Sequence, residues 1–165
     1  MKSLRCILWS TLVLLPLVCG FAAAADAPRA NTFSDVADWK SLVITHERLG
    51  CFGSCPAYRV EIHGDGTVLY KGTAFVTERG ERRSTISVEM VQALVGRFRR
   101  ADFFSLNAVY AKPLDCEAAV TSIAFDGHFK SVENQCGAST LVSQLEGAID
   151  RAANIESWIK KPLTR

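Results

Sequence analysis

Several features that would mark a common class of protein are missing from the sequence. After the first 25 residues, no apolar run approaches the roughly 18 residues of a membrane-spanning helix. Of the 19 basic residues, two lie in those first 25 residues, which leaves 17 against 17 acidic residues. A chain without a basic excess is a poor candidate for binding nucleic acid. Gly-x-Ser-x-Gly, His-Glu-x-x-His and a glycine-rich phosphate loop are also absent. We therefore predict no catalytic residue, no metal site and no cofactor.

The N-terminus has the three parts of a secretory signal peptide. The basic stretch Met1–Arg5 precedes the apolar run Cys6–Phe21, and the small residues Ala22–Ala25 follow. The apolar run is short for a membrane anchor, and Pro16 interrupts it. An uncleaved anchor and lipid attachment at Cys19 are the alternatives. We expect a signal peptide at residues 1–25 and export to the periplasm or the outside of the cell, with no transmembrane span after cleavage.

The remaining chain of about 140 residues is long enough for one hydrophobic core. Residues 26–40 mix Ala, Pro, Asn, Asp and Ser, and they are predicted to form a flexible N-terminal arm. Residues 41–160 are predicted to form a single α+β domain.

Four cysteines follow the signal peptide, and an even number in an exported domain predicts two disulfides. Cys51 and Cys55 are separated by three residues that include a glycine, so a turn can bring them together. Cys116 and Cys136 flank a hairpin predicted around Asp126-Gly127, and its register brings them together at the open end. The spacing favours the pairs Cys51–Cys55 and Cys116–Cys136 among the three possible connectivities.

The clearest predicted element is a β-hairpin over residues 58–72. Apolar and polar residues alternate on both sides of Gly64-Asp65-Gly66, a three-residue loop typical of hairpins. This hairpin is expected to pair Ile62 with Val68 and Val60 with Tyr70. Four other strands are predicted at residues 41–49, 73–77, 119–125 and 128–134, with a charged turn at residues 78–83.

Two amphipathic helices are predicted. Ser87 is expected to cap the first, with Glu89 in its first turn, and Ser139 or Thr140 to cap the second. The apolar stripe of the first helix comprises Val88, Val91, Leu94, Val95 and Phe98. The stripe of the second comprises Leu141, Leu145, Ala148, Ile149, Ala152 and Ile155. These elements favour an α+β fold, in which an antiparallel sheet of about five to six strands has two helices on one face and two disulfides.

A string of residues around the first cysteine pair resembles a known family. The string is Arg48-x-x-Cys51-Phe52-Gly53-x-Cys55-Pro56-x-Tyr58-x-Val60-x-Ile62, followed by Asp65-Gly66-x-Val68-x-Tyr70-x-Gly72. Weaker matches continue through Phe103-Phe104-x-Leu106, Tyr110, Asp115, Thr121 and Lys130 to Leu145-Glu146-x-x-Ile149-Asp150. The chain is similar here to the exported bacterial family called domain of unknown function 6438. The resemblance implies an exported α+β domain and assigns no catalytic residue.

Thiol chemistry at Cys51 and Cys55 is the sharpest functional hypothesis. A redox-active pair needs an exposed thiolate of low pKa. Pro56 leads into a predicted strand, so a helix that could stabilise this thiolate is not evident. We therefore favour a structural disulfide, with a thiol-disulfide redox protein as the alternative. A metal site is not predicted, because no metal-ligand spacing links His46, His63, His128, Asp115 and Glu117.

The predicted function is that of a non-catalytic exported binding or interaction module, so the chain is not expected to be an enzyme. Its partner would be a protein or a small ligand in the cell envelope. Turns on rigid scaffolds often carry function, which favours a contact surface around the first cysteine pair. The predicted surface comprises Arg48, Phe52, Gly53, Ser54, Tyr58, Tyr110 and Asp115. Within it, a hydrogen bond between Tyr110 and Asp115 is expected to organise the loop after the first helix or to line a small pocket.

Overall fold

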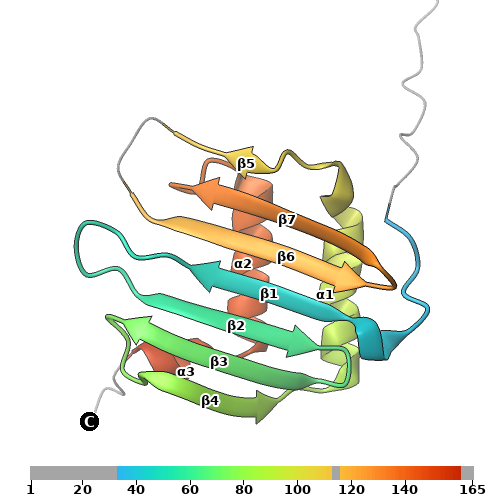
Figure 1. Cartoon of the computed structure of the whole chain (residues 1–165), viewed down its shortest axis with the longest axis horizontal. Coiled ribbons are helices and arrows are strands. Elements are labelled where there is room, and N and C mark those ends of the chain that lie inside the picture. Colours follow the sequence, from blue (N-terminus) through green and yellow to red (C-terminus); the bar gives the residue numbers. More distant parts are fainter. Residues whose placement is uncertain (1–32, 113–115, 161–165) are drawn as a thin grey trace, which may run out of the picture.

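The computed structural model describes residues 33–112 and 116–160, and it confirms the α+β fold (Figure 1). Within these residues, seven strands form one sheet in the order β4-β3-β2-β1-β6-β7-β5, slightly more strands than predicted. Neighbouring strands are antiparallel except β5 and β7, which are parallel. The strands are β1 (Val43–Arg48), β2 (Ala57–His63), β3 (Thr67–Ala74), β4 (Gly80–Thr85), β5 (Val109–Tyr110), β6 (Ala118–Phe125) and β7 (His128–Gln135).

Two long helices, α1 (Val88–Arg100) and α2 (Thr140–Ala152), cover one face of this sheet (Figure 1). The short helix α3 (Glu156–Ile159) follows α2, and the 3₁₀ helices are η1 (Trp39–Ser41) and η2 (Phe103–Ser105). Among the described residues, no helix is long and apolar enough to cross a membrane. The predicted signal peptide and Asp115 lie outside the described residues.

The predicted β2–β3 hairpin is confirmed. Ile62 pairs with Val68, and Val60 pairs with Tyr70. Gly66 closes the loop with a positive φ of 87°, and a Cβ atom there would lie 2.2 Å from the carbonyl oxygen of Ile86. The loop therefore requires glycine both for its backbone conformation and for its close contact.

The next strand and turn were predicted in the wrong places. The strand expected at residues 73–77 ends at Ala74, where β3 ends, and Phe75 takes a positive φ of 53°. The turn expected at residues 78–83 is largely the edge strand β4. The reason is that β4 buries neither of its faces, so its sequence has no apolar alternation that could identify it as a strand.

Both helices begin where their caps predict, but their apolar stripes differ from the expectation. Ser87 Oγ accepts a hydrogen bond from the backbone of Met90, and Ser139 Oγ accepts one from the backbone of Val142. The stripe of α1 is buried except for Val88, which is exposed. In α2, Val142 is buried, whereas Leu141 is exposed. Leu141 was predicted in the stripe in place of Val142 because both residues are apolar, so the sequence alone does not determine which one faces the sheet.

The alternation of the strands divides the sheet into a covered face and an open face. Apolar side chains such as Ile44, Val60 and Ile123 turn toward the helices and form the core. Phe33 joins this core at one side, with its ring 5.3 Å from Phe104 and 5.2 Å from Phe125. The covered face becomes polar only toward the end of the sheet where β1 leads into β2.

Candidate functional site

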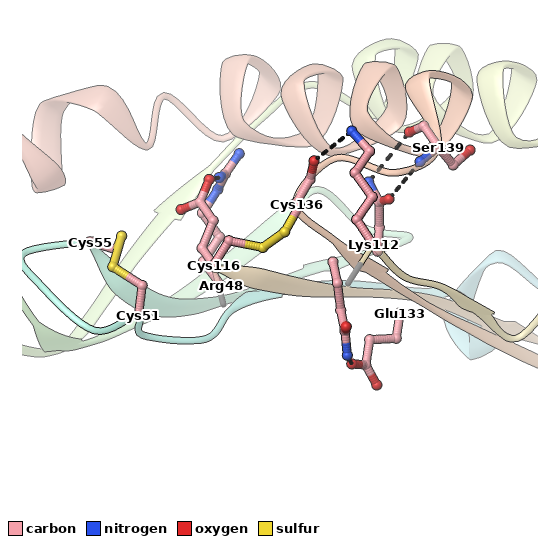
Figure 2. The surroundings of a disulfide bond; sticks show 11 residues. Arg48, Cys51, Cys55, Lys112, Cys116, Glu133, Cys136 and Ser139 are labelled. Atoms are coloured by element: carbon pink, nitrogen blue, oxygen red, sulfur yellow. Dashed lines mark hydrogen bonds and ion pairs between the residues drawn. A yellow bond between two sulfur atoms is a disulfide. The ribbon is translucent and has the colours of Figure 1, made fainter. Parts of the chain in front are cut away.

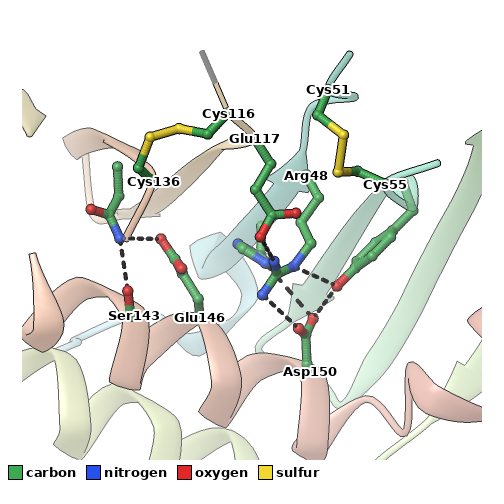
Figure 3. A network of polar contacts seen from close by, with 12 residues as sticks. Arg48, Cys51, Cys55, Cys116, Glu117, Cys136, Ser143, Glu146 and Asp150 are labelled. Atoms are coloured by element: carbon green, nitrogen blue, oxygen red, sulfur yellow. Dashed lines mark hydrogen bonds and ion pairs between the residues drawn. A yellow bond between two sulfur atoms is a disulfide. The ribbon is translucent and has the colours of Figure 1, made fainter. Parts of the chain in front are cut away.

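A group of polar side chains lies between the sheet and α2, near both disulfides (Figure 3). Alternation along β1 turns His46 and Arg48 toward the helices, on the same face as Ile44. The register places Tyr58 of β2 opposite Arg48. Asp150 reaches the same place from α2. We call His46, Arg48, Tyr58 and Asp150 the polar cluster.

The hydroxyl of Tyr58 connects this cluster. It accepts a hydrogen bond from Arg48 Nε at 3.1 Å and donates one to Asp150 Oδ1 at 2.8 Å. The guanidinium of Arg48 also lies 3.6 Å from Asp150 Oδ2 and 3.2 Å from Glu117 Oε1. These side chains therefore satisfy one another's hydrogen bonds inside the protein, as burial of polar groups requires.

Burial controls the ionisation of these groups. It raises the pKa of the Asp150 carboxyl, although the hydrogen bond from Tyr58 and the charge of Arg48 act in the opposite direction. Burial and the negative charge of Asp150 raise the pKa of Tyr58, so its hydroxyl stays protonated and able to donate. Burial alone would lower the pKa of Arg48, but its interactions with Tyr58, then with Asp150 and Glu117, outweigh this effect and raise it.

His46 is fully buried and neutral. Its Nδ1 atom lies 3.2 Å from the hydroxyl of Thr121, within hydrogen-bond distance. Its Nε2 atom has no hydrogen-bond partner among the described residues and lies 3.7 Å from Asp150 Oδ1. Burial, followed by the positive charge of Arg48, lowers the pKa of His46 to about 3. A neutral imidazole is therefore the form that the folded protein contains at neutral pH.

Three side chains in this region have the types and the spatial order of a nucleophile–base–acid triad, namely Thr121, His46 and Asp150. However, Thr121 and His46 are both completely shielded from solvent. A substrate carbonyl cannot approach the Thr121 hydroxyl in this arrangement, and the contact of His46 with Asp150 is longer than a hydrogen bond. Thr121 and His46 are therefore packed inside the protein, out of contact with solvent.

A second polar group fastens the beginning of α2 to β7 (Figure 3). The amide nitrogen of Asn134 donates to Ser143 Oγ and to Glu146 Oε1, both at 3.0 Å. Its amide oxygen accepts from the backbone of Ser139 at 2.9 Å, at the cap of the helix. Burial raises the pKa of Glu146, although the hydrogen bond from Asn134 opposes this effect. Together these contacts fix the rotation of α2 that points Asp150 at the cluster.

The predicted Cys51–Cys55 disulfide is confirmed, and it closes the loop between β1 and β2 (Figure 2). Gly53 N donates to the carbonyl of Cys51 at 2.8 Å, and Gly53 has a φ of 152°. The side chain of Phe52 is 94% exposed, more than any other large hydrophobic side chain of the described residues. The loop, which the disulfide closes, thus exposes an aromatic side chain to solvent.

The predicted Cys116–Cys136 disulfide is also confirmed, and it joins the ends of β6 and β7 (Figure 2). The Cα atoms of the two cysteines are 5.5 Å apart. Figures 2 and 3 place Arg48 between the two disulfides. Covalent bonds therefore restrain the backbone on both sides of the polar cluster.

A surface pocket of about 360 Å³ lies beside the Cys51–Cys55 loop. Arg48 and Tyr58 contribute to its wall, together with Gly50, Arg59 and Lys71. A larger pocket of about 510 Å³ lies on the open face of the sheet around Leu69 and is not part of this site. Glu47, Arg59 and Lys71 belong to the open face of the sheet, opposite to the side on which Arg48 and Tyr58 contact Asp150.

The structure brings together only some of the residues predicted from the sequence. Arg48 and Tyr58 meet in the polar cluster, while Phe52 lies at the exposed loop next to them. Tyr110 lies on the edge strand β5, away from β1 and β2, and its hydroxyl accepts a hydrogen bond from the backbone of Asn107 at 3.2 Å. Its predicted bond to Asp115 stays a prediction, because Asp115 is not among the described residues.

The sequence analysis missed the central acid of the site, Asp150, and did not assign His46 to it. A signal for both was present. His46 and Arg48 continue the buried face of β1 in steps of two, and Glu146 and Asp150 lie on the buried side of α2 four residues apart. Polar residues on an apolar face indicate a buried network. In the described part of the chain, no group of three or more His, Cys, Asp or Glu side chains could hold a metal ion.

Comparison with known proteins places the chain in a family. A search among curated proteins found no match. A family model matches residues 42–153, which include the Cys51–Cys55 loop, the polar cluster and nearly the whole described fold. The chain therefore belongs to the family described as Domain of unknown function (DUF6438).

Proposed function

We propose that this protein is an exported, non-catalytic binding module that holds a partner protein of the cell envelope through its Cys51–Cys55 loop. The observation that carries the proposal is Phe52, whose ring is 94% exposed on a loop closed by a disulfide. Aromatic residues are enriched at the centres of protein interfaces. Burying this ring against a partner would supply about 1.5–3 kcal/mol.

The loop is held in place before any partner arrives. The disulfide closes it, and its two stems are β1 and β2, which Arg48 and Tyr58 connect at their ends. Asp150 and Glu117 fix Arg48 in turn. A loop that is already ordered loses little conformational entropy on binding, which favours affinity.

The polar cluster supports a binding role more than a catalytic one. Its hydrogen-bonding groups are used on one another, and the triad-like contacts of His46 are closed to solvent. Export is supported by the signal-peptide pattern of residues 1–25 and by two disulfides, which form in oxidising compartments. The periplasm or the cell exterior fits both features.

The test compares Phe52→Ala with Phe129→Ala, a matched control whose ring is 67% exposed on β7. Each mature protein is immobilised and exposed to envelope proteins of the producing cell. A protein retained by wild type and by the control is then purified, and its Kd is measured by calorimetry. We expect Phe52→Ala to weaken binding by about 10- to 100-fold, with the control unchanged. Equal binding by all three proteins would contradict the proposal.

A thiol-disulfide redox role is the second candidate, because Cys51 and Cys55 are both partly exposed to solvent. Cys55 is followed by Pro56 and β2 rather than by a helix that could stabilise a thiolate. The reduction potential of each pair decides between the roles, with Cys116–Cys136 as the internal reference. A structural Cys51–Cys55 bond should titrate below about −300 mV, whereas opening near thioredoxin-like potentials would support the redox role.

A further inference from the structure

The helix layer carries a groove between α1 and α2. The first turns of α1 lie beside the last turn of α2, and the last turn of α1 lies beside the first turn of α2, so the helices are antiparallel (Figure 1). Two hollows of about 140 and 220 Å³ follow the line between them. Both are lined by Arg97, so we treat them as one feature and call it the helix groove.

The floor of the helix groove is apolar. Leu94 and Leu145 form its base, and the small side chains of Ala93 and Ala148 let another chain approach closely. Met90 and Leu141 are 45% and 41% exposed at its two ends. These two side chains extend the apolar surface of the helix groove to both of its ends.

The rim of the helix groove is basic. Arg97, Arg100 and Arg151 line it, and all three are exposed. Among the described residues, no carboxylate lies within 4 Å of any of them, although Arg151 acts on Asp150 over a longer distance. Glu146 and Asp150, the acids of α2, face the sheet instead. The groove thus combines an apolar floor with three arginines that have no ion-pair partner among the described residues.

From this combination we infer that the helix groove binds an acidic amphipathic helix of a partner protein. The apolar stripe of such a helix would cover Met90 and Leu141, and its flanking carboxylates would pair with the three arginines. A third helix can pack along the groove between two antiparallel helices at the usual interaxial distance of about 8–10 Å. This surface is separate from the Cys51–Cys55 loop, so the inference does not rest on the proposed function.

A helical partner fits better than two other occupants. A flat anionic bilayer would contact the arginine heads but would not reach the buried floor formed by Leu94, Leu145 and Ala148. A second copy of this chain would have to offer an acidic helical stripe, and the described helices offer none. Several described surface carboxylates are already in ion pairs, namely Glu47, Glu61, Glu78, Glu117 and Glu156.

The probe for the test is a synthetic amphipathic peptide of about three heptads, with Leu and Ala on one face and Glu beside them. A peptide with Lys in place of Glu and a peptide of scrambled order are the comparisons. Binding to the mature protein is measured by fluorescence anisotropy at low and high salt. Amide NMR shifts locate the contact. We expect the Glu peptide alone to bind, more weakly in high salt, with shifts confined to α1 and α2.

The variant protein carries Arg97→Gln, Arg100→Gln and Arg151→Gln. The matched control carries Lys71→Gln and Arg83→Gln, which remove cations that also have no described ion-pair partner, on β3 and β4. We expect the groove variant to lose about tenfold in affinity and the control to lose less than about twofold. Thermal melts check that both variants fold, and Phe52→Ala should bind the peptide like wild type.

Three results would overturn the inference. The first is equal binding of the Glu, Lys and scrambled peptides, or no binding of the Glu peptide. The second is that the Glu peptide does not bind, while wild type sediments with phosphatidylglycerol vesicles and the groove variant does not. This result would assign the arginines to a membrane surface. The third is a dimer in analytical ultracentrifugation that the groove variant abolishes, which would assign the groove to a second copy of the chain.

Discussion

The buried imidazole of His46 should make the domain lose stability as the pH falls. Its pKa is lowered from 6.5 to about 3, chiefly by burial and then by the charge of Arg48. Between these two values the unfolded state binds a proton that the folded state does not, so acid favours unfolding. The contribution of His46 is fully present above about pH 6.5 and is lost as the pH falls toward 3. At pH 5 the loss amounts to about 2 kcal/mol.

Two carboxyls between α2 and the sheet act in the opposite direction. The pKa values of Asp150 and Glu146 are raised, chiefly by burial, so the folded state takes up their protons first. Their contribution to stability therefore rises as the pH falls from the raised value toward the ordinary one. The effect of His46 must be isolated by comparison with a variant that keeps both carboxyls.

His46→Gln is that variant, and Ile44→Val, two residues earlier on the same buried face of β1, is its control. Urea unfolding at pH 7 and at pH 5 gives the free energy of unfolding of each protein. We expect His46→Gln to be less stable than wild type at pH 7, with the gap shrinking by about 2 kcal/mol at pH 5. Ile44→Val should keep the same gap at both pH values, because it changes no titratable group. A gap for His46→Gln that is the same at both pH values would refute a neutral His46 in the folded state.

Three further predictions concern stability, measured by urea unfolding at pH 7. Tyr58→Phe removes the hydroxyl that donates to the partly buried Asp150 carboxylate at 2.8 Å, so the free energy of unfolding should fall by about 1–3 kcal/mol. An unchanged value would contradict the hydrogen-bond network. Replacing Cys116 and Cys136 by Ser opens a loop with a sequence separation of 20 residues and should lower the free energy of unfolding by about 3 kcal/mol. A decrease below about 1 kcal/mol would show that the chain without the disulfide keeps the hairpin ordered. Gly64→Ala would place a Cβ atom 1.8 Å from a backbone oxygen and should cost about 3 kcal/mol or more, while Gly50→Ala, with nothing within 4 Å, should change little.

The elements that the sequence predicts well are those whose determinants lie close together in the chain. The β2–β3 hairpin depends on alternation around a single glycine loop, and its predicted pairs are observed. The Cys116–Cys136 bond follows from the register of one hairpin. By contrast, β4 is a polar edge strand, and β5 is two residues long and parallel to β7. Neither strand has a local pattern, because its pairing partner decides its conformation.

The polar cluster was harder to predict because it is assembled from distant segments. Tyr58 and Asp150 are separated by 92 residues, and His46 and Thr121 by 75. The sequence shows that polar residues interrupt apolar faces of β1 and α2, but it does not show that these interruptions coincide. Their meeting depends on the rotation of α2, which also exposes Leu141 instead of burying it.

The polar cluster contributes more to the choice of strand register than to the stability of the fold. A buried ionic group is often no more stable than an apolar core of the same shape, because both charges lose their hydration. A slip of β1 by one residue, however, would turn His46 and Arg48 to the open face and leave the partly buried Asp150 without its cation. Leaving a charge unpaired in a largely desolvated site is unfavourable. The cluster therefore selects the register of β1 against β2, and that register is what sets the position of the Cys51–Cys55 loop and of the aromatic ring that it displays.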